Sequence, residues 1–453
     1  MDATAPDRPA AVSRREAFLF WLKLGFVSFG GPAGQIAIMH AELVERRRWI
    51  SEQRFLHALN YCMLLPGPEA QQLATYIGWL MHRTWGGLVA GGLFVLPSLF
   101  ILMALSWVYL RFGDLPVVAG VFYGIKPAVV AIVLHAAHRI GTRALANRWM
   151  VLLAALSFAA LTFLDAPFPA IVAAAALAGW IGSRVAPGVF MPAAAARAAS
   201  GQPHAPALID DHTPTPDHAR FSRVRLLQVM ACGLGAWALV MGALVATQGW
   251  QATLTQMGLF FSKAALLTFG GAYAVLPYVY QGAVEHFGWL TGPQMIDGLA
   301  LGETTPGPLI MVVAFVGFVG GWQQAVLGPD ALLAGAMLAA SVVTFFTFLP
   351  SFIFILAGGP LVEATHGRLG FTAPLTAITA AVVGVILNLA LFFAQHVVWP
   401  QGWSGPVDAV AGALVVLAAA ALFRLKLGVM PLLAASGLAG LLLTQAVPSL
   451  LRL

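Results

Sequence analysis

The chain alternates long apolar runs with short polar connections. Nine of these runs reach or approach the roughly 20 residues that a helix needs to cross a lipid bilayer, and a few fall short of a full span unless flanking residues contribute. They cover residues 86–110, 117–138, 150–164, 170–181, 226–246, 331–356, 371–393, 407–423 and 429–443. The pattern predicts an all-α polytopic membrane protein.

Composition supports this class. Of the 453 residues, 60% are hydrophobic and only 9% are charged, whereas a soluble domain has roughly 25% charged residues. The net charge of +6 would suggest nucleic-acid binding in a soluble protein. Here the arginines lie between apolar runs, where positive charge marks the cytoplasmic side of a membrane protein, so no nucleic-acid partner is expected.

The sequence contains an internal repeat. Pro-Gly-Pro at 66–68 recurs at 306–308, and Phe-Gly-Gly at 29–31 recurs at 269–271, in both cases 240 residues later. The same offset relates further pairs in order, namely Lys23 with Lys263, Glu45 with Glu285, Trp49 with Trp289 and Leu59 with Leu299. Leu-Pro-Ser at 96–98 recurs at 349–351 with an offset of 253, which implies a 13-residue insertion (253 minus 240) in the second copy near 328–340.

These boundaries divide the chain into five parts. The two transporter repeats cover 15–186 and 254–447, and residues 1–14 form a cytoplasmic tail. Residues 187–225 are rich in Pro, Ala, Asp and His without periodicity, which is typical of a disordered linker. One apolar run, 226–249, then predicts a single linking transmembrane helix between the copies.

The repeat is expected to be inverted. Each copy holds four clear spanning runs, preceded by two elements that are interrupted at Phe-Gly-Gly and at Pro-Gly-Pro. An even number of crossings per copy, joined by one helix, places the second copy upside down relative to the first, as in many transporters. The loop 45–54 carries four arginines whereas its equivalent 285–294 carries no lysine or arginine, as inversion and the positive-inside rule require.

The number of crossings stays open between two versions. The first has nine crossings plus four re-entrant helical hairpins, and it places the four-arginine loop in the cytoplasm; the second has thirteen full crossings. We prefer the re-entrant version. Both versions place the N-terminus in the cytoplasm and the C-terminus outside.

The interruptions predict an anion site. Proline removes amide donors and disfavours helix before each ring, so each second half-helix begins with free N–H groups and a positive dipole end. In an inverted repeat the two Pro-Gly-Pro breaks converge near the midplane, where their helix N-termini suit a compact dianion. The alternative is that these prolines and glycines only kink packed helices.

Candidate substrate-binding residues follow from the breaks and from the few ionisable groups on apolar segments. Lys23 and Lys263 would supply paired cations, unless they only snorkel to the membrane interface, and Lys126 is a third cation. The backbone candidates are Gly30, Gly31, Pro66, Gly67, Pro68, Gly270, Gly271, Pro306, Gly307 and Pro308. The side-chain hydrogen-bond candidates, which could equally bond the backbone, are Ser28, Gln71, Thr268, Thr304 and Thr305.

Two carboxylates flank the breaks at positions that the repeat does not relate. A carboxylate beside an anion pocket is repulsive unless it is protonated, so Glu303 and Glu69 are candidate proton carriers. Glu69 has the alternative role of a carboxylate at a helix N-terminus, and Asp297 is expected at the membrane interface. Nucleotide-binding and hydrolase motifs are missing from the sequence, and we expect no enzyme activity, no cofactor and no metal site.

Four stretches make the chain similar to the long, two-domain members of the chromate ion transporter (CHR) superfamily. They are FGGPAGQIAIMHAELVERRRWI, RFLHALNYCMLLPGPEAQQLATYIGW, TFGGAYAVLPYV and GLALGETTPGPLIMVVAFVGF. The resemblance implies antiparallel duplicate halves in the cell (inner) membrane and chromate efflux that confers resistance, driven by the proton motive force.

Several functional alternatives stay open beside that resemblance. Sulfate has the same tetrahedral shape and charge as chromate, so a sulfate-type carrier and an anion channel with the same fold are alternatives. The expected partners are chromate or sulfate, protons and the lipid bilayer, and a homodimer is left open.

Overall fold

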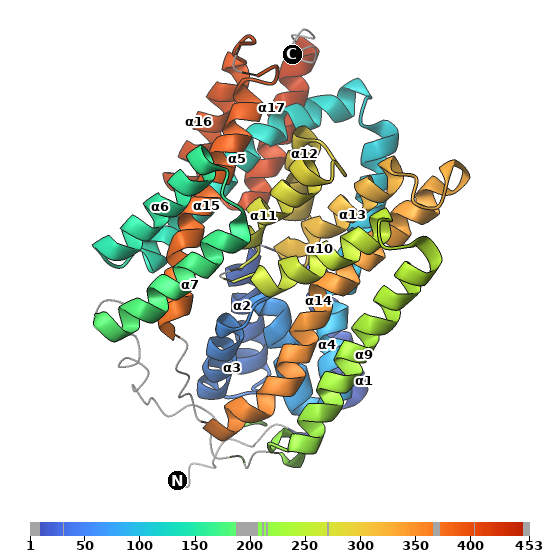
Figure 1. The fold of residues 1–453 in the computed structure, drawn as a ribbon, viewed down its shortest axis with the longest axis vertical. Coiled ribbons are helices and arrows are strands. Elements are labelled where there is room, and N and C mark those ends of the chain that lie inside the picture. Colours follow the sequence, from blue (N-terminus) through green and yellow to red (C-terminus); the bar gives the residue numbers. More distant parts are fainter. Residues whose placement is uncertain are drawn as a thin grey trace, which may run out of the picture.

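The described part of the chain is nearly all helical. The computed structural model describes residues 10–29, 31–186, 207–210, 213, 216–269, 271–365, 372–402 and 404–446, which hold 16 α-helices (Figure 1). Seven of these are long and apolar enough to cross a membrane. They are α4 (Glu69–Phe112), α5 (Pro116–Ala144), α7 (Phe168–Val185), α9 (Arg223–Gln248), α14 (Leu332–Thr365), α15 (Thr372–Val398) and α17 (Val429–Ala446).

Two shorter apolar helices, α6 (Arg148–Leu164) and α16 (Ala409–Phe423), complete the set. Together these nine helices coincide with the nine apolar runs. The prediction of an all-α polytopic membrane protein is therefore confirmed. The number of crossings stays a prediction, because helix length alone does not separate a crossing from a re-entrant segment.

The interrupted elements occur in the same order in both copies. The first copy has α1 (Arg14–Val27), α2 (Gly31–His40), the π-helix η1 (Ala41–Arg46) and α3 (Glu52–Leu64) before α4. The second has α10 (Thr253–Leu267), α11 (Ala272–Tyr280), the π-helix η4 (Gln281–His286) and α12 (Gly292–Thr304), followed by η5 (Leu309–Met311) and α13 (Val312–Gln323). Both α3 and α12 have 13 residues, and both π-helices have six. The offset of 240 thus relates whole elements as well as motifs.

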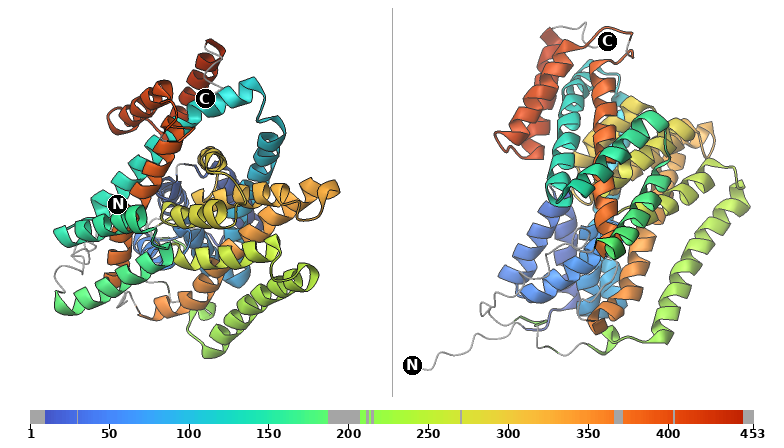
Figure 2. Two further views of the ribbon diagram at one scale, coloured as in Figure 1. Left: turned by 45° about the horizontal axis from the view of Figure 1, so that its top comes forward. Right: turned by 60° about the vertical axis from the view of Figure 1, so that its left-hand side comes forward.

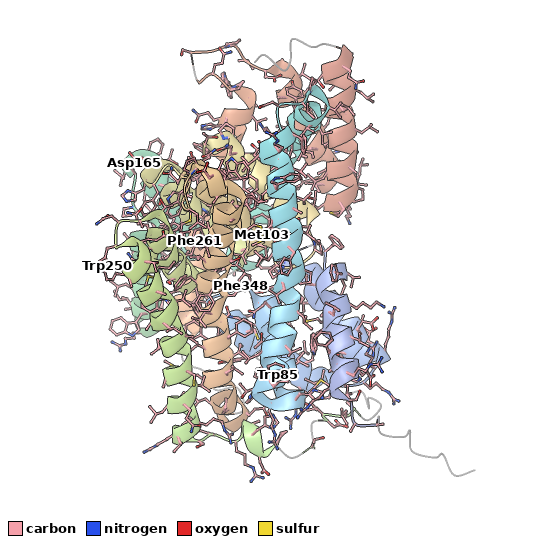
Figure 3. The ribbon with its side chains drawn as sticks, turned by 90° about the vertical axis from the view of Figure 1, so that its right-hand side faces the viewer. Trp85, Met103, Asp165, Trp250, Phe261 and Phe348 are labelled. Carbon is pink, nitrogen blue, oxygen red and sulfur yellow. The ribbon has the colours of Figure 1, made fainter. Side chains whose placement is uncertain are left out.

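The first part of α4 folds back on the rest of the helix. The backbone leaves helical geometry at His82 and Arg83, where φ of Arg83 is 58°. A Cβ added at Gly78 would lie 2.5 Å from the carbonyl of Gly86 and from the side chain of Ala90. The half-helix 69–81 therefore packs antiparallel to the segment that begins at 84, and that segment then runs along the molecule from Trp85 past Met103 (Figure 3).

The second copy makes the same fold with a longer turn. Helix α13 packs against α14, where a Cβ at Gly321 would meet the side chain of Ala339 at 2.5 Å. Between them lie residues 324–331, including the short helix η6 (Pro329–Ala331). These residues overlap the region where the two sequence offsets place the insertion.

The two copies interlock. Helices α4 and α14 contact each other in the middle of the molecule, α1 packs on α4, and α10 packs on α14. Helix α5 of the first copy packs against α15, α16 and α17 of the second. Helices α1–α3 lie in the lower half of Figure 1 and α10–α12 in the upper half, and α9 runs along the outside (Figures 1 and 2).

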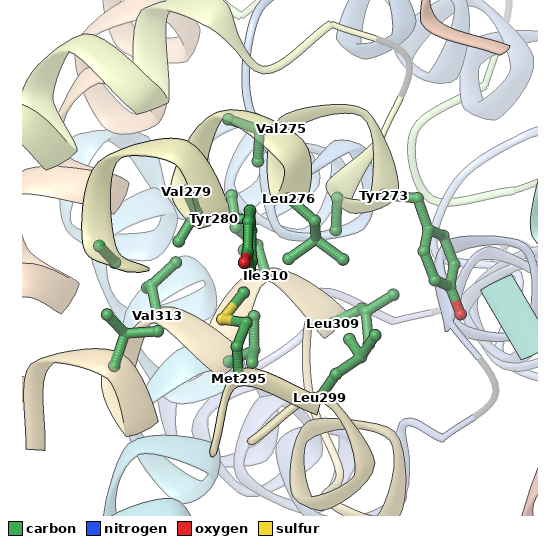
Figure 4. Close-up of a cluster of buried hydrophobic side chains, with 14 of the residues drawn as sticks. Tyr273, Val275, Leu276, Val279, Tyr280, Met295, Leu299, Leu309, Ile310 and Val313 are labelled. Atoms are coloured by element: carbon green, nitrogen blue, oxygen red, sulfur yellow. The ribbon is translucent and has the colours of Figure 1, made fainter. Parts of the chain in front are cut away.

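A buried apolar cluster holds the second break in place. Side chains of α11, α12 and η5 meet there, including Leu276, Leu299 and Leu309 (Figure 4). Tyr273 lies at the edge of this cluster, with its hydroxyl group pointing away from it (Figure 4). The cluster therefore fixes the backbone on both sides of 305–308 and leaves one polar group facing outward from the cluster.

Part of the linker is attached to the first copy. Ile209 forms an isolated parallel bridge with Ile50, and the short helix η3 (Asp217–Ala219) follows. The ring Nε2 of His218 lies 3.0 Å from the carbonyl oxygen of Trp79. Residues 207–210 and 216–222 thus have defined contacts that their composition did not predict, while 187–206 lie outside the described residues.

Candidate functional site

Each Pro-Gly-Pro break is bonded to the other copy of the repeat. Helix α3 ends at Leu64 and α4 begins at Glu69, and between them Gly67 donates its backbone N–H to the carbonyl of Thr268 at 2.7 Å. In the second copy, Gly307 donates its N–H to the carbonyl of Ser28 at 2.8 Å. The two bonds are equivalent under the repeat, because the two donors are 240 residues apart and so are the two acceptors.

The Leu-Pro-Ser motifs also contact the break of the opposite copy. Ser351 lies against Gly67, and Ser98 lies against Gly307. Both glycines have positive φ, 128° and 102°, a backbone conformation that glycine adopts without the steric strain that a Cβ atom would cause. The Pro-Gly-Pro loop of one copy is therefore enclosed by the residue before Phe-Gly-Gly and by Leu-Pro-Ser of the other.

Two glutamines of the first copy form hydrogen bonds with the breaks, and neither has an equivalent in the second copy. Gln35 donates its Nε2 hydrogen to the carbonyl of Gly307 at 2.5 Å, and Gln72 donates to the carbonyl of Pro66 at 2.8 Å. The residues 240 positions later are Val275 and Val312. A search for repeated motifs misses both glutamines for this reason.

Several buried polar atoms around the breaks have no hydrogen-bond partner among the described residues. They are the hydroxyl oxygens of Ser28 and Ser98 and the Oε1 atoms of Gln35, Gln71 and Gln72. Buried polar groups are nearly always paired, and leaving one unpaired costs about 1–3 kcal/mol. The two serine hydroxyls can each donate to an oxyanion.

The three candidate threonines are already bonded to backbone. Thr268 donates to the carbonyl of Ala264 at 2.7 Å. Thr304 and Thr305 donate to the carbonyl of Leu301 at 2.9 Å and 2.6 Å. The hydroxyls of Ser28 and Ser98 are therefore the freer donors at the breaks.

The remaining backbone candidates lie in or beside the breaks. Gly31 and Gly271 have positive φ, 70° and 95°. Gly30 and Gly270 lie outside the described residues. Pro66, Pro68, Pro306 and Pro308 flank the two bonded glycines.

The two candidate proton carriers have different surroundings. Glu303 is buried in α12 and accepts a hydrogen bond from the hydroxyl of Tyr273. Glu69 is the first residue of α4, in the position of a carboxylate that interacts with a helix dipole. Arg139 interacts electrostatically with both carboxylates, so α5 brings a cation to the region of the breaks that the sequence presented only as a cytoplasmic anchor.

Lys23 and Lys263 lie on the surface of the described structure. Both side chains are exposed. Lys23 shares its helix face with Leu19 and Phe26, which are 53% and 51% exposed. An exposed face of this composition suits lipid, so the environment of Lys23 favours the snorkelling alternative.

Lys126 lies in a cavity apart from the breaks. The cavity has a volume of about 500 Å³ and lies between the end of α4, the first half of α5, the end of α15 and the starts of α12 and α16. Lys126 contacts Asp297, with Nζ 3.4 Å from Oδ2. Asp297 is 3% exposed, so its carboxylate is buried within the protein, and its depth relative to the membrane surface stays a prediction. We call this cavity the vestibule.

The chain resembles proteins described as chromate transporters. The profile of the family described as "Chromate transporter" matches residues 15–180 and 255–441, within the two predicted repeats. A chromate transport protein of Pseudomonas aeruginosa is 33% identical over 97% of this chain and 94% of its own length. One from Cupriavidus metallidurans is 30% identical over 84% and 83%, respectively. No solved structure matches the chain.

Proposed function

This chain belongs to the chromate transporter family, and on that premise we propose that it exports chromate from the cytoplasm as a secondary transporter driven by the proton motive force. The observation that carries the proposal is the reciprocal bonding of Gly67 to Thr268 and of Gly307 to Ser28. It joins two helix breaks from different copies through buried residues, and transporter substrates bind at such repeat interfaces. We propose no enzyme activity and no cofactor.

The groups around the breaks suit a tetrahedral dianion. Half-helix α4 starts directly after the first break, and a helix start offers N–H donors and positive potential to an anion. The hydroxyls of Ser28 and Ser98 are unpaired within the described residues, and Arg139 adds positive charge. These features support chromate binding between the two copies, with Gln71 and the flanking prolines as lining residues.

Proton coupling is proposed for Glu303. Its carboxyl group is buried next to a break and is bonded to a neutral hydroxyl rather than to a cation within salt-bridge distance. Such a group carries a proton at low energetic cost when an anion lies nearby, and it releases that proton once the anion leaves. Glu69 is a second carrier by position, with its helix-dipole role as the alternative.

The proposed orientation has the N-terminus in the cytoplasm, the C-terminus outside and the protein in the cell (inner) membrane. The arginines of loop 45–54 support it through the positive-inside rule. The fold-back of 69–81 supports the re-entrant version of the inverted repeat. Labelling of Arg48→Cys tests both, in a chain whose exposed Cys232 is replaced by serine; labelling from outside the cell would overturn the re-entrant version.

Flux in reconstituted vesicles tests the function. We expect saturable chromate movement that follows an imposed pH gradient and stops when the gradient is collapsed. Continuous chromate conductance that ignores the gradient would identify an anion channel. Sulfate flux without chromate flux would identify a sulfate-type carrier.

A further inference from the structure

The vestibule contains an ion pair that joins the two copies, with a buried carboxylate and a partly exposed ammonium group. Lys126 comes from α5 of the first copy and Asp297 from α12 of the second, and their Nζ and Oδ2 atoms are 3.4 Å apart. The hydroxyl of Tyr109, near the end of α4, donates to the same Oδ2 at 2.9 Å. The Asp297 side chain is 5% exposed and that of Lys126 is 31% exposed, so the cation faces the cavity while the carboxylate lies behind it.

The two oxygens of Asp297 are unequal. Oδ2 accepts from both Lys126 and Tyr109, whereas Oδ1 is buried with no hydrogen-bond partner among the described residues. A proton arriving at this carboxylate therefore binds Oδ1. Oδ2 can still accept from Tyr109 after that change, so protonation alters the charge without dismantling the hydrogen bond that positions the group.

Most of the other polar groups of the vestibule have bonding partners of their own. Tyr123 donates to both oxygens of Asp408, at 2.9 Å and 2.8 Å, and Asp408 also caps α16 through the N–H of Ala411 at 2.8 Å. The Nδ1 of His396 lies 3.0 Å from the carbonyl of Phe392. Asp114 lines the cavity with an exposed side chain. The remaining elements in contact with α12, which are α13, α17 and η5, contain no titratable residue.

Lys126 is the one lysine or arginine among the residues that line the described cavity. While it is paired with Asp297 its charge is neutralised, and the vestibule, which also holds Asp114 and Asp408, repels anions. Neutralising Asp297 would leave an ammonium group facing a cavity large enough for a hydrated oxyanion.

We propose that Lys126 is an outer binding station for the transported oxyanion. Asp297 is paired with the ammonium group of Lys126 until a proton from the outer solution binds the Oδ1 atom of Asp297 and frees that ammonium group. The inference rests on the proposed function for the identity of the anion. The proton moves from solvent to the carboxylate, and the oxyanion takes the place of the carboxylate charge beside the ammonium group of Lys126. Proton and oxyanion binding at this station are therefore linked, and each strengthens the other.

Binding of sodium chromate to the purified full chain in detergent tests the proposal without any gradient. The measurement is made at about pH 8, where a free aspartate carboxyl group is ionised. Asp297→Asn, which mimics the protonated carboxyl, should bind chromate about tenfold more tightly than the unchanged chain. In weakly buffered solution the unchanged chain should take up protons as chromate binds, and Asp297→Asn should take up fewer.

Three further variants isolate the pair. Lys126→Met in the Asp297→Asn background should remove the gain in affinity, and Lys126→Arg should keep it. Asp114→Asn removes an equal charge from the same cavity and should change the affinity by less than about twofold, because the exposed carboxylate is screened by solvent. Gel filtration of each variant checks that it is folded.

The outcomes separate this inference from the proposed function. Equal chromate affinity and equal proton uptake in Asp297→Asn and the unchanged chain would overturn the station, even if vesicles still show pH-driven chromate flux. The expected affinity changes together with no chromate flux in vesicles would leave the station standing and overturn the transport proposal. If the gain in chromate affinity persists in Lys126→Met, it arises from the change in net charge of the cavity, and this result would also overturn the station.

Discussion

Gly67 donates its backbone N–H to the carbonyl of Thr268 at 2.7 Å, although the two residues belong to different copies of the repeat. The same bond with the copies exchanged joins Gly307 to Ser28. Each break is thus completed by the other copy, and neither copy forms its half of the candidate site alone. This relationship makes the two glycines the sharpest test of the site.

Gly67→Ala and Gly307→Ala should each lower chromate flux by about tenfold or more. Alanine at positive φ adds about 1–3 kcal/mol of backbone strain, and the new methyl groups would meet Gln72 at 2.6 Å and Ser98 at 2.8 Å. Flux per folded protein in vesicles measures the effect. Gly249→Ala, after α9, has positive φ but open space, and Gly92→Ala is helical with open space, so these controls separate strain and clash from substitution itself. Normal flux in both break variants would contradict the site.

Arg54 and Glu363 should stabilise the contact between the copies on the side of the four-arginine loop. Their Nη1 and Oε2 atoms are 3.1 Å apart with side chains 15% and 8% exposed, and Tyr76 donates to Glu363 at 2.5 Å. Breaking a buried pair costs about 3–5 kcal/mol, so Glu363→Gln should lower the unfolding temperature strongly.

A double-mutant cycle with Arg54→Gln and Glu363→Gln measures the coupling in this pair. The more exposed i,i+4 pair Glu42–Arg46 is the matched control, and it should contribute about 0.5 kcal/mol or less. A coupling for Arg54 and Glu363 no larger than that of the control would show that the pair does not hold the copies together.

Docking of the linker should weaken as the pH falls. Burial lowers the pKa of His218 below its ordinary value of 6.5, and the nearby Arg83 and Arg225 lower it further, while the bond to Trp79 opposes them. The docked linker therefore favours the neutral ring. Its stabilising contribution is present above about pH 6.5 and is lost as the pH falls through the lowered pKa.

Hydrogen exchange of residues 216–222 measures this docking as a function of pH. Exchange should speed up on acidification in the unchanged chain. In His218→Asn, which keeps an N–H donor but cannot titrate, the rate should no longer depend on pH beyond intrinsic exchange. The same pH dependence in both proteins would assign the effect to another group.

The sequence predicted the helices and the breaks because both are local properties. Apolar runs define the helices, and the glycines and prolines interrupt them wherever they occur. The hydrogen-bond partners of the breaks are not a local property. Nothing in the Pro-Gly-Pro motif indicates that Gly67 bonds to Thr268 rather than to its own copy, because that depends on how the two copies interlock.

Other residues at the candidate site were missed for the same reason. Gln35, Gln72 and Ser98 take part through contacts between distant segments, and the two glutamines have no equivalents in the second copy. Arg139 was interpreted by its charge as a cytoplasmic anchor, while its electrostatic reach to Glu303 depends on the path of α5. The burial of Asp297 beside Lys126 was missed because this contact joins residues that are 171 positions apart (297 minus 126).

Lys23 and Lys263 should be dispensable for substrate binding, despite their matched positions. Their side chains are exposed, and the face of Lys23 is otherwise apolar. We expect the double variant Lys23→Gln, Lys263→Gln to keep its chromate affinity within about twofold, since screened surface charges contribute little. Arg139→Gln should lose affinity by about tenfold, because removing a charge from a partly buried site is felt more strongly. The opposite ranking would restore the paired-cation proposal.

Glu303→Gln should impair proton coupling more than chromate binding. The glutamine side chain keeps the size of the carboxyl and can still accept a hydrogen bond from Tyr273, but it cannot take up or release a proton. In vesicles, chromate exchange without a gradient should persist while accumulation driven by a pH gradient is lost. Tyr273→Phe separates the hydrogen bond from the charge, because it keeps the titrating carboxyl: it should shift the pH at which flux is half-maximal without abolishing coupling. Gradient-driven accumulation in Glu303→Gln equal to that of the unchanged chain would remove Glu303 from the coupling mechanism and leave Glu69 and Asp297 as the carboxylates to test.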